Sequence, residues 1–353
     1  MEASARQSWT VKMEKIHVKA RKEYDVLVGS GLLEKSGELI TGTCSGIQKL
    51  LVVTDSNVSK LYMAKLRNSL EKAGFEVYEF VFAAGEQSKN LDTIAQVLGT
   101  LAVNAFTRTD AVVALGGGVA TDMAGFAASI FLRGIKVFQI PTSLLAQVDA
   151  SVGGKTGVDL PQGKNLVGSF YQPSLVIADT SLLSTLNDDV FTEGMAEVIK
   201  HAFIRDEGLY KTLRQKVTKA SPELEQIVAQ NIRIKAEVVA QDEHDNGLRQ
   251  LLNFGHTIGH AIESQSNYTV PHGFAVAKGM ERITRTSPIH DELVEMLKLY
   301  GLPYEDPIKS EKIMQGVMNY KKKRGGKITI ALVNKIGRGE LKTIQIEELE
   351  KYL

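Results

Sequence analysis

The chain has 353 residues, of which 43% are hydrophobic and 24% charged, and its formal net charge is +1. This length and hydrophobic content are enough for two soluble domains with their own cores. The near-neutral charge provides no overall field to attract nucleic acid or an anionic membrane. The single cysteine, Cys44, excludes an internal disulfide and a cysteine-built metal site, as is typical of the reducing cytosol.

The first residues, MEASARQSWTVK, lack the apolar core of a secretory signal. The chain also has no apolar run approaching the roughly 20 residues that span a bilayer. We therefore expect a cytoplasmic protein whose first strand begins near Lys15, after a leader.

Short β-branched runs alternate with helical patterns in the first half of the chain. Strands are predicted at residues 49–55, 75–82, 110–118, 135–143 and 174–180, and helices at 57–74 and 90–103. This order is typical of βαβ units on a mostly parallel sheet.

Beyond about residue 185 the pattern becomes helical. Helices are predicted at residues 190–215, 222–243, 249–265 and 289–299, and a hairpin or strand pair at 326–337. We expect an α/β, Rossmann-like domain with a mostly parallel sheet over residues 1–185. A mostly α-helical domain is expected over residues 186–353. Ligands of open α/β sheets bind beyond the carboxyl ends of the strands, so the cleft between the domains is the expected site.

The glycine-rich stretch LGGGVATDMAG (115–125) follows a predicted strand and opens a helix. Such a loop can approach a diphosphate closely. Thr121 replaces the last glycine of G-x-G-x-x-G, so a plain glycine turn is the alternative. Asp55 and the loop AAGEQSKN (83–90), with Glu86 and Lys89, follow other strands and favour nucleotide binding.

A second glycine motif, GGKT at residues 153–156, resembles the end of a P-loop. The first glycine of a P-loop would fall on Asp149, whose carboxylate would repel a triphosphate. Lys155, with Lys164 and Asn165 further on, nevertheless indicates an anionic ligand other than ATP.

Three of the seven histidines fall between residues 256 and 272. His256 and His260 are four residues apart on one helical face and can bind one metal ion. Thr257 stands where the zincin motif has Glu, which does not favour peptide hydrolysis. His272 follows in TVPHGFAV.

Glu197 and Lys200 lie three apart in EGMAEVIKH. They are either an exposed ion pair or, because their neighbours are apolar, a partly buried one. Together the cations suggest a small anionic substrate: Arg133, Lys155, Lys164, Lys200, Lys235 and Arg249. The residues alone indicate a nucleotide-plus-metal enzyme acting on a sugar phosphate, and they leave the reaction open.

Longer motifs resemble the 3-dehydroquinate synthase family: GGGVATDMAG, FLRGIKVFQIPTSLLAQVDASVGGKTGVDLPQGKN, GMAEVIKH, and DEHDNGLRQLLNFGHTIGHAIE followed by HG. The resemblance runs in the same order from about residue 25 to 335. It implies conversion of 3-deoxy-D-arabino-heptulosonate 7-phosphate to 3-dehydroquinate and phosphate, in the shikimate pathway to chorismate and the aromatic amino acids. The implied steps are oxidation, phosphate elimination, reduction, ring opening and aldol closure. The implied cofactors are NAD and a divalent metal, zinc or cobalt.

By position, the resemblance implies that Glu197, His256 and His272 bind the metal and that His260 contacts the substrate. It also implies a homodimer in which the partner subunit delivers Arg133. The residues implied in catalysis are Asp149, Lys155, Lys200, Lys235, Arg249, Asn253 and His260. Those implied in substrate binding are Arg133, Lys164, Asn165, Asp245 and Lys321. Those implied at the NAD site are Asp55, Glu86, Lys89, Gly117, Gly118, Asp122, Thr142, Lys164 and Thr185.

The sequence departs from the family pattern at several places. Phe274 and Asp245 stand where Glu is expected, Thr121 alters the glycine loop, and the segment 280–300 is shorter. In the lysine run, Lys321 is assigned in preference to Lys322. The alternatives are a sister sugar phosphate cyclase with another substrate, a metal-dependent alcohol or glycerol dehydrogenase, and a non-catalytic metabolite-binding protein.

Overall fold

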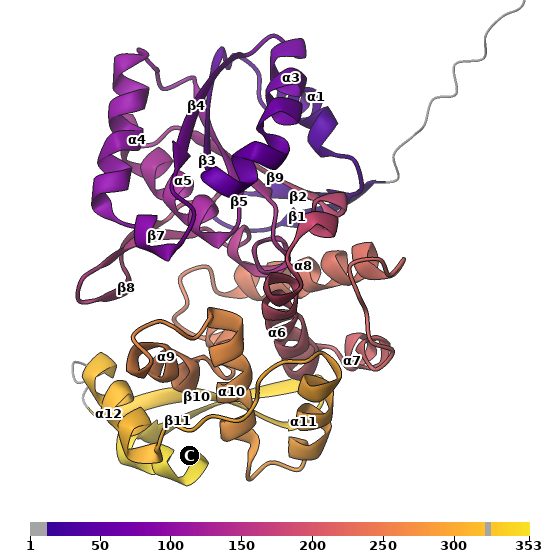
Figure 1. Ribbon diagram of the computed structural model, residues 1–353, viewed down its shortest axis with the longest axis vertical. Coiled ribbons are helices and arrows are strands. Elements are labelled where there is room, and N and C mark those ends of the chain that lie inside the picture. Colours follow the sequence, from indigo (N-terminus) through magenta and orange to yellow (C-terminus); the bar gives the residue numbers. More distant parts are fainter. Residues whose placement is uncertain (1–12, 322–325) are drawn as a thin grey trace, which may run out of the picture.

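The computed structural model describes residues 13–321 and 326–353. A seven-stranded sheet forms the upper half in Figure 1, in the order β1-β2-β9-β6-β5-β3-β4. Its strands are β1 (Met13–Val18), β2 (Tyr24–Gly29), β3 (Lys49–Asp55), β4 (Glu76–Phe82), β5 (Ala111–Gly116), β6 (Lys136–Pro141) and β9 (Leu175–Asp179). β1 pairs with β2 antiparallel, and the remaining pairs are parallel.

Helices cover both faces of this sheet because its strands are apolar on both sides. In β3, Leu50 and Val52 pack on one face, and Leu51 and Val53 pack on the other. The first face carries α1 (Ser36–Thr43) and α3 (Ala64–Lys72), preceded by the turns η1 (Leu33–Lys35), α2 (Ser56–Val58) and η2 (Ser59–Met63). The second face carries α4 (Leu91–Val103), which follows η3 (Glu86–Ser88), and α5 (Gly118–Ile130).

The lower half is mostly helical and shares a core with the sheet (Figure 1). It contains α6 (Asp188–Arg205), α7 (Glu207–Leu213), α8 (Leu224–Gln241), α9 (His256–Gln265), α10 (His272–Thr284), α11 (His290–Leu299) and α12 (Ser310–Lys321). It also contains the paired strands β10 (Lys327–Lys335) and β11 (Arg338–Gln345), followed by η8 (Ile346–Tyr352). The residues of α6 and α8 pack in one cluster with Val26 of β2 and Val176 of β9.

Four further short helical segments carry predicted site residues. They are η4 (Phe131–Arg133), η5 (Ala146–Ala150), η6 (Thr180–Thr185) and η7 (Leu248–Asn253). Of these, η4 lies within the α/β half, between α5 and β6. Strands β7 (Lys155–Leu160) and β8 (Gly163–Phe170) form a hairpin that projects from the lower left of the upper half in Figure 1.

The predicted fold class, an α/β half with a mostly parallel sheet followed by a helical half, is confirmed. The five predicted strands are present, and the terminal strand pair is too, although the predicted span 326–337 covers only β10, and β11 extends to Gln345. The predicted helix 249–265 is wrong as one element, because Gly255 takes φ +77° and separates η7 from α9. The boundary at residue 185 remains a prediction, and η6 ends there. No helix in the described ranges is both long and apolar enough to cross a bilayer.

Candidate active site

The loops after three neighbouring parallel strands meet at one edge of the sheet. After β5, Gly117 is the N-cap of α5 and Gly118 its first residue. After β6, the Thr142 N–H donates to the Gly116 carbonyl at 2.9 Å. After β3, the Asp55 carboxylate accepts two backbone N–H groups as the cap of α2. These predicted cofactor residues therefore share the edge where open α/β sheets bind ligands, beside a helix N-terminus suited to an anion.

Lys89 links two further segments to this edge. Its side chain is 5% exposed, and its ammonium donates to the Asp122 carboxylate and to the Asn165 side-chain carbonyl, both at 2.6 Å. Burial lowers the pKa of Lys89, but Asp122 and Glu86 outweigh burial, so its pKa lies above the ordinary value. A charged Lys89 thus holds α5 and the β7–β8 hairpin together.

The GGKT motif begins a hairpin, not a phosphate loop. Gly153 and Gly154 have φ +93° and +71°, a conformation that other residues adopt at a cost. A Cβ on Gly153 would lie 2.5 Å from a guanidinium nitrogen of Arg249. The Arg249 guanidinium donates to the Gly153 carbonyl at 2.9 Å. The glycines therefore let buried Arg249, from η7, approach the start of β7.

The hairpin separates Lys155 and Asn165, which the sequence predicts to bind one anionic ligand. Lys155 is paired with Phe170 in the strand register, five positions beyond Asn165 on β8. Lys155 forms an ion pair with Asp245, whereas Asn165 accepts from Lys89. The structure thus places Lys155 at one end of the hairpin and Asn165 near its turn.

Four charged side chains from η5, α6 and α8 lie together; Glu197, Lys200 and Lys235 are buried, whereas Asp149 is 27% exposed. Glu197 and Lys200 are each 1% exposed and form an ion pair, so the alternative of an exposed helix pair is wrong. The Lys235 ammonium, 5% exposed, lies 2.7 Å from the Asp149 carboxylate. Burying charges is costly unless they are paired, and such clusters concentrate at functional sites.

This cluster shifts the pKa values of its members. Burial raises the pKa of Asp149, but Lys235 and Lys200 outweigh it and hold that pKa well below its usual range. Burial lowers the pKa of Lys235 to about 8, although Asp149 opposes the change. The pKa of Lys235 therefore lies well below that of an exposed lysine.

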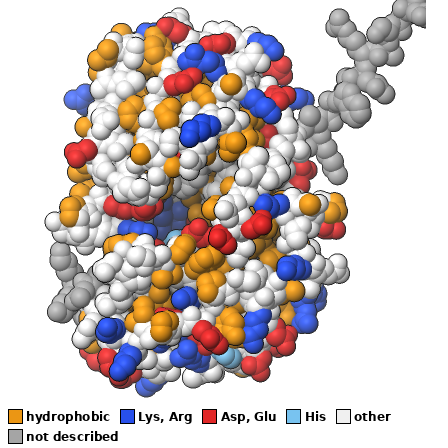
Figure 2. Space-filling model, viewed as in Figure 1, with side chains coloured by type: hydrophobic (Ala, Val, Ile, Leu, Met, Phe, Trp, Pro, Cys, Tyr) orange, Lys and Arg blue, Asp and Glu red, His pale blue; other side chains and the backbone are white. Residues whose placement is uncertain are grey.

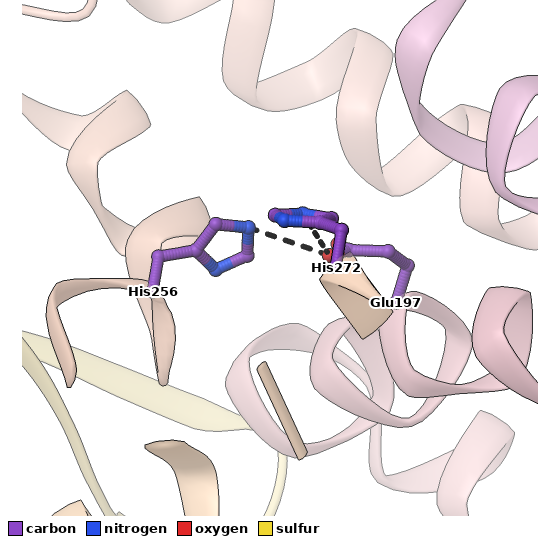
Figure 3. A group of neighbouring side chains, drawn as sticks. All are labelled: Glu197, His256 and His272. Atoms are coloured by element: carbon purple, nitrogen blue, oxygen red, sulfur yellow. Dashed lines mark ion pairs between the residues drawn. The ribbon is translucent and has the colours of Figure 1, made fainter. Parts of the chain in front are cut away.

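Glu197, His256 and His272 direct ligand atoms toward one another (Figure 3). Glu197 lies within α6, and the two histidines are the first residues of α9 and α10. The Nε2 atoms of His256 and His272 lie 3.3 and 3.7 Å from the same carboxylate oxygen, Oε1 of Glu197. The three possible ligand atoms lie within 4.8 Å of one another.

This group fits a divalent metal ion. Two imidazole nitrogens and one carboxylate form a three-ligand set that leaves a position open. Both Glu197 oxygens are buried without a hydrogen-bond donor of good geometry among the described residues. The Nδ1 of His256 lies 3.2 Å from the Phe254 carbonyl; donating there would leave Nε2 free to bind a cation.

His260 is close to this group without belonging to it. Its ring centroid lies 5.4 Å from that of His256, and its side chain is 44% exposed. The structure groups His260 with Glu263 and His272 instead. Helical spacing alone paired His256 with His260, whereas the set implied by the family resemblance is the one brought together.

Two buried residues were not identified from the sequence. Glu263, 2% exposed, lies 3.1 Å from the Lys164 ammonium, and Lys164 is also 3.7 Å from Glu86. His201 is fully buried, lies 3.0 Å from the Asn231 side-chain oxygen, and is grouped with Asp149 and Glu197. Each is the last residue of a motif already quoted, EGMAEVIKH for His201 and the HAIE run for Glu263, but only helix packing reveals that it faces the site.

The remaining predicted residues lie outside the charged cluster and the Glu–His–His group. Thr185 ends η6, and its hydroxyl contacts that of Tyr62. Asn253 ends η7 and lines a small cavity of about 10 Å³. Arg133 is exposed and precedes β6, so it lies at the amino ends of the parallel strands, whereas the glycine loop lies at their carboxyl ends. Lys321 is the last residue of α12, and its side chain lies outside the described part of the chain.

The face shown in Figure 2 is hollowed between the two halves, and Lys, Arg and His side chains are visible there. A mostly parallel α/β half, a helical half and a Glu–His–His group built around a buried carboxylate define a class of α/β proteins with a candidate metal site. Residues 79–193 match the 3-dehydroquinate synthase N-terminal family and residues 194–323 the C-terminal family. The chain belongs to the 3-dehydroquinate synthase family, which makes it a cyclase of the lyase type.

Individual relatives agree with this assignment. The 3-dehydroquinate synthase of Streptococcus gordonii is 42% identical over 345 residues, covering 94% of this chain and 96% of the relative. A 2-deoxy-scyllo-inosose synthase, solved with carbaglucose-6-phosphate, NAD+ and Co²⁺, is 25% identical with a TM-score of 0.84, covering 96% of this chain and 98% of that chain.

Two other solved structures share the fold. The 2-epi-5-epi-valiolone synthase of Streptomyces hygroscopicus subsp. jinggangensis 5008, with NAD+ and Zn²⁺ bound, is 26% identical with a TM-score of 0.84, covering 95% of this chain and 97% of that chain. An iron-containing alcohol dehydrogenase is 18% identical with a TM-score of 0.68, and the match covers 95% of this chain and 97% of that chain. At that identity the likeness concerns the fold alone.

Proposed function

We propose that this protein converts 3-deoxy-D-arabino-heptulosonate 7-phosphate to 3-dehydroquinate and phosphate, with NAD+ and a divalent zinc or cobalt ion as cofactors. Family membership supports the reaction. The observation that carries the proposal is the buried cation group Lys200, Lys235 and Arg249 beside Glu197, His256 and His272. Such a site suits a substrate with two anionic groups and several hydroxyls.

The proposed cofactors divide between the two halves. Bound NAD+ would supply a reversible hydride acceptor, and the metal a Lewis acid for substrate hydroxyls. Glu197, His256 and His272 would hold the metal. The residues proposed for NAD+ line the carboxyl edge of the sheet and the adjoining loops: Asp55, Glu86, Lys89, Gly117, Gly118, Asp122, Thr142, Lys164 and Thr185.

The cations would hold the substrate in one position through all the steps. Lys200, Lys235 and Arg249 are fixed by burial, and charge-assisted hydrogen bonds to a phosphate or carboxylate are strong and directional. Asp149, kept ionised by Lys235, would in turn favour the charged form of that lysine. Lys155, Asn165, Asp245, Asn253, His260 and Lys321 are proposed to complete the substrate site.

Arg133 is proposed to act in the partner subunit of a homodimer. Within one chain it precedes β6, whereas the glycine loop follows β5, and these two strands run parallel. The two positions are therefore at opposite edges of the sheet. A second copy of the chain would be needed to bring this exposed cation to an active site.

Two other functions remain to be distinguished by experiment. A sister cyclase would act on a sugar phosphate that lacks a carboxylate, and Lys235 and Arg249 would then have less reason to be buried beside the site. A dehydrogenase would release NADH and would have no use for a phosphate-binding group. The cation cluster favours the carboxylated substrate over both.

The test is phosphate release by the purified protein with NAD+ and Zn²⁺, from the heptulosonate phosphate and, separately, from glucose 6-phosphate. We expect release only from the heptulosonate phosphate. The Arg249→Ala variant should lose release while keeping NAD+ affinity, because Arg249 lies on η7, away from the glycine loop. Preferential release from glucose 6-phosphate would support a sister cyclase instead.

A further inference from the structure

Glu263 of α9 is a buried acid to which the proposed function gives no role. Its side chain is 3% exposed, and an isolated buried carboxylate is strongly unfavourable. Its two oxygens have different partners. Oε1 lies 3.1 Å from the Lys164 ammonium, and Oε2 lies 3.4 Å from Nδ1 of His272.

The contact with His272 is the counterpart of one at His256. In each histidine Nε2 faces Oε1 of Glu197, at 3.3 Å for His256 and 3.7 Å for His272. In each, Nδ1 faces an oxygen on the opposite side of the ring: the Phe254 carbonyl at 3.2 Å and Glu263 at 3.4 Å. Metal-binding histidines ordinarily donate their second N–H to such an oxygen, which fixes the tautomer and the ring orientation.

We propose that Glu263 is a positioning residue that holds His272 with Nε2 toward the metal and ties this ligand to Lys164 of the β7–β8 hairpin. The proposal rests on the metal site of the proposed function. For His256 the orienting oxygen is a backbone carbonyl. For His272 it belongs to the side chain of Glu263, which a substitution can remove. Glu263 therefore acts on the metal only through His272.

A direct ligand role is the competing reading, because Glu263, His260 and His272 also have possible ligand atoms within 4.8 Å of one another. Two observations argue against a second metal ion bound by Glu263, His260 and His272. Lys164 already places a positive charge 3.1 Å from Oε1 of Glu263. His272 would also have to serve both ions. We therefore expect one metal ion per chain.

The test measures Zn²⁺ affinity by chelator competition and the Co²⁺ absorption spectrum, on the full chain stripped of metal. For Glu263→Ala we expect binding weaker by about 10- to 100-fold, with a changed Co²⁺ spectrum. For Glu263→Gln, which keeps an accepting oxygen without charge, a smaller loss of about threefold or more is expected. Unfolding curves of both variants report whether they fold, and the Gln variant carries the test if the Ala variant does not.

Two matched variants separate the causes. Lys164→Gln should keep Zn²⁺ affinity within about twofold of wild type, because Lys164 touches no metal ligand. Glu281→Gln removes another buried carboxylate, on α10, whose partner is Arg285 at 2.9 Å, and should leave Zn²⁺ affinity unchanged.

The proposal is overturned by wild-type affinity in Glu263→Gln, by an equal loss in Lys164→Gln, or by two Zn²⁺ ions per wild-type chain. A wild-type chain that binds no Zn²⁺ would contradict the proposed metal site itself. The stoichiometry of the wild type therefore separates failure of the proposed function from failure of the role given to Glu263.

Discussion

At the scale of single residues, burial makes the charge of Lys235 depend on pH. Its ammonium is almost fully enclosed and is stabilised mainly by Asp149 at 2.7 Å. Burial disfavours the charged form and brings the pKa to about 8. The positive charge that would hold an anionic substrate is therefore lost as the pH rises above about 8.

This pKa predicts a basic limb in the pH profile. Lys235 loses its proton as the pH rises through about 8, so kcat/KM for the anionic substrate should fall above that pH. In Lys235→Arg the group stays charged, because the pKa of arginine exceeds about 12. The limb should then move to higher pH, even if the maximal rate falls. A limb at the same pH in both proteins would assign it to another group.

At the scale of elements, the β7–β8 hairpin depends on backbone conformations that only glycine adopts easily. Gly153 combines φ +93° with contact to Arg249, where a Cβ would lie 2.5 Å from a guanidinium nitrogen. Two costs therefore meet at one position: backbone strain and displacement of a buried cation.

Gly153→Ala should lower the free energy of unfolding by about 1–3 kcal/mol and raise KM for the substrate. Urea unfolding and steady-state kinetics measure the two effects. Gly42→Ala in α1 is the control, since no atom lies within 4 Å of the added Cβ and alanine favours a helix by about 0.5–1 kcal/mol. Equal stabilities of the two variants would contradict the strain assigned to Gly153.

The same elements show what the sequence could predict. The runs KLLVVTD and DAVVALGGG are rich in valine and form β3 and β5, so these strands and the fold class were accessible from the sequence. The hairpin was not, because GGKTGVDLPQGKN has few β-formers and its glycines resembled a phosphate loop. Helix α10 was not predicted, although Pro271 directly before His272 is a signal typical of a helix start.

The site was predictable only in part, for a geometric reason. Spacing within one helix pointed to His256 and His260, because four residues make one turn. The group that converges joins Glu197, His256 and His272 from three helices, and no local pattern encodes how α6, α9 and α10 pack. The family resemblance supplied that information, although it did not point to Glu263.

At the scale of the whole molecule, the two halves are joined through a shared core, and the site lies between them. The residues of α6 and α8 pack with β2 and β9, while Arg249 and Lys164 make polar links across the junction. Arg133, by contrast, lies at the amino end of β6, away from the glycine loop, and this position supports the homodimer that the family resemblance implies.

The homodimer proposal predicts complementation between two inactive variants. Arg133→Ala and Lys235→Ala should each be inactive alone. After mixed refolding or co-expression, about a quarter of wild-type activity should return, because half of the dimers are mixed and each contains one complete site. Mixtures that stay inactive despite mixed dimers, seen by mass spectrometry, would place Arg133 in its own subunit's site or outside catalysis.

The central claim is that one protein oxidises, eliminates phosphate, reduces and closes a ring without consuming NAD+. The most direct measurement supplies Zn²⁺, NAD+ equimolar with the enzyme, and the heptulosonate phosphate in about hundredfold excess, and follows phosphate release together with absorbance at the NADH band. We predict that nearly all the substrate releases its phosphate while NADH does not accumulate. Release that stops after one equivalent, with a matching rise in NADH, would contradict the account.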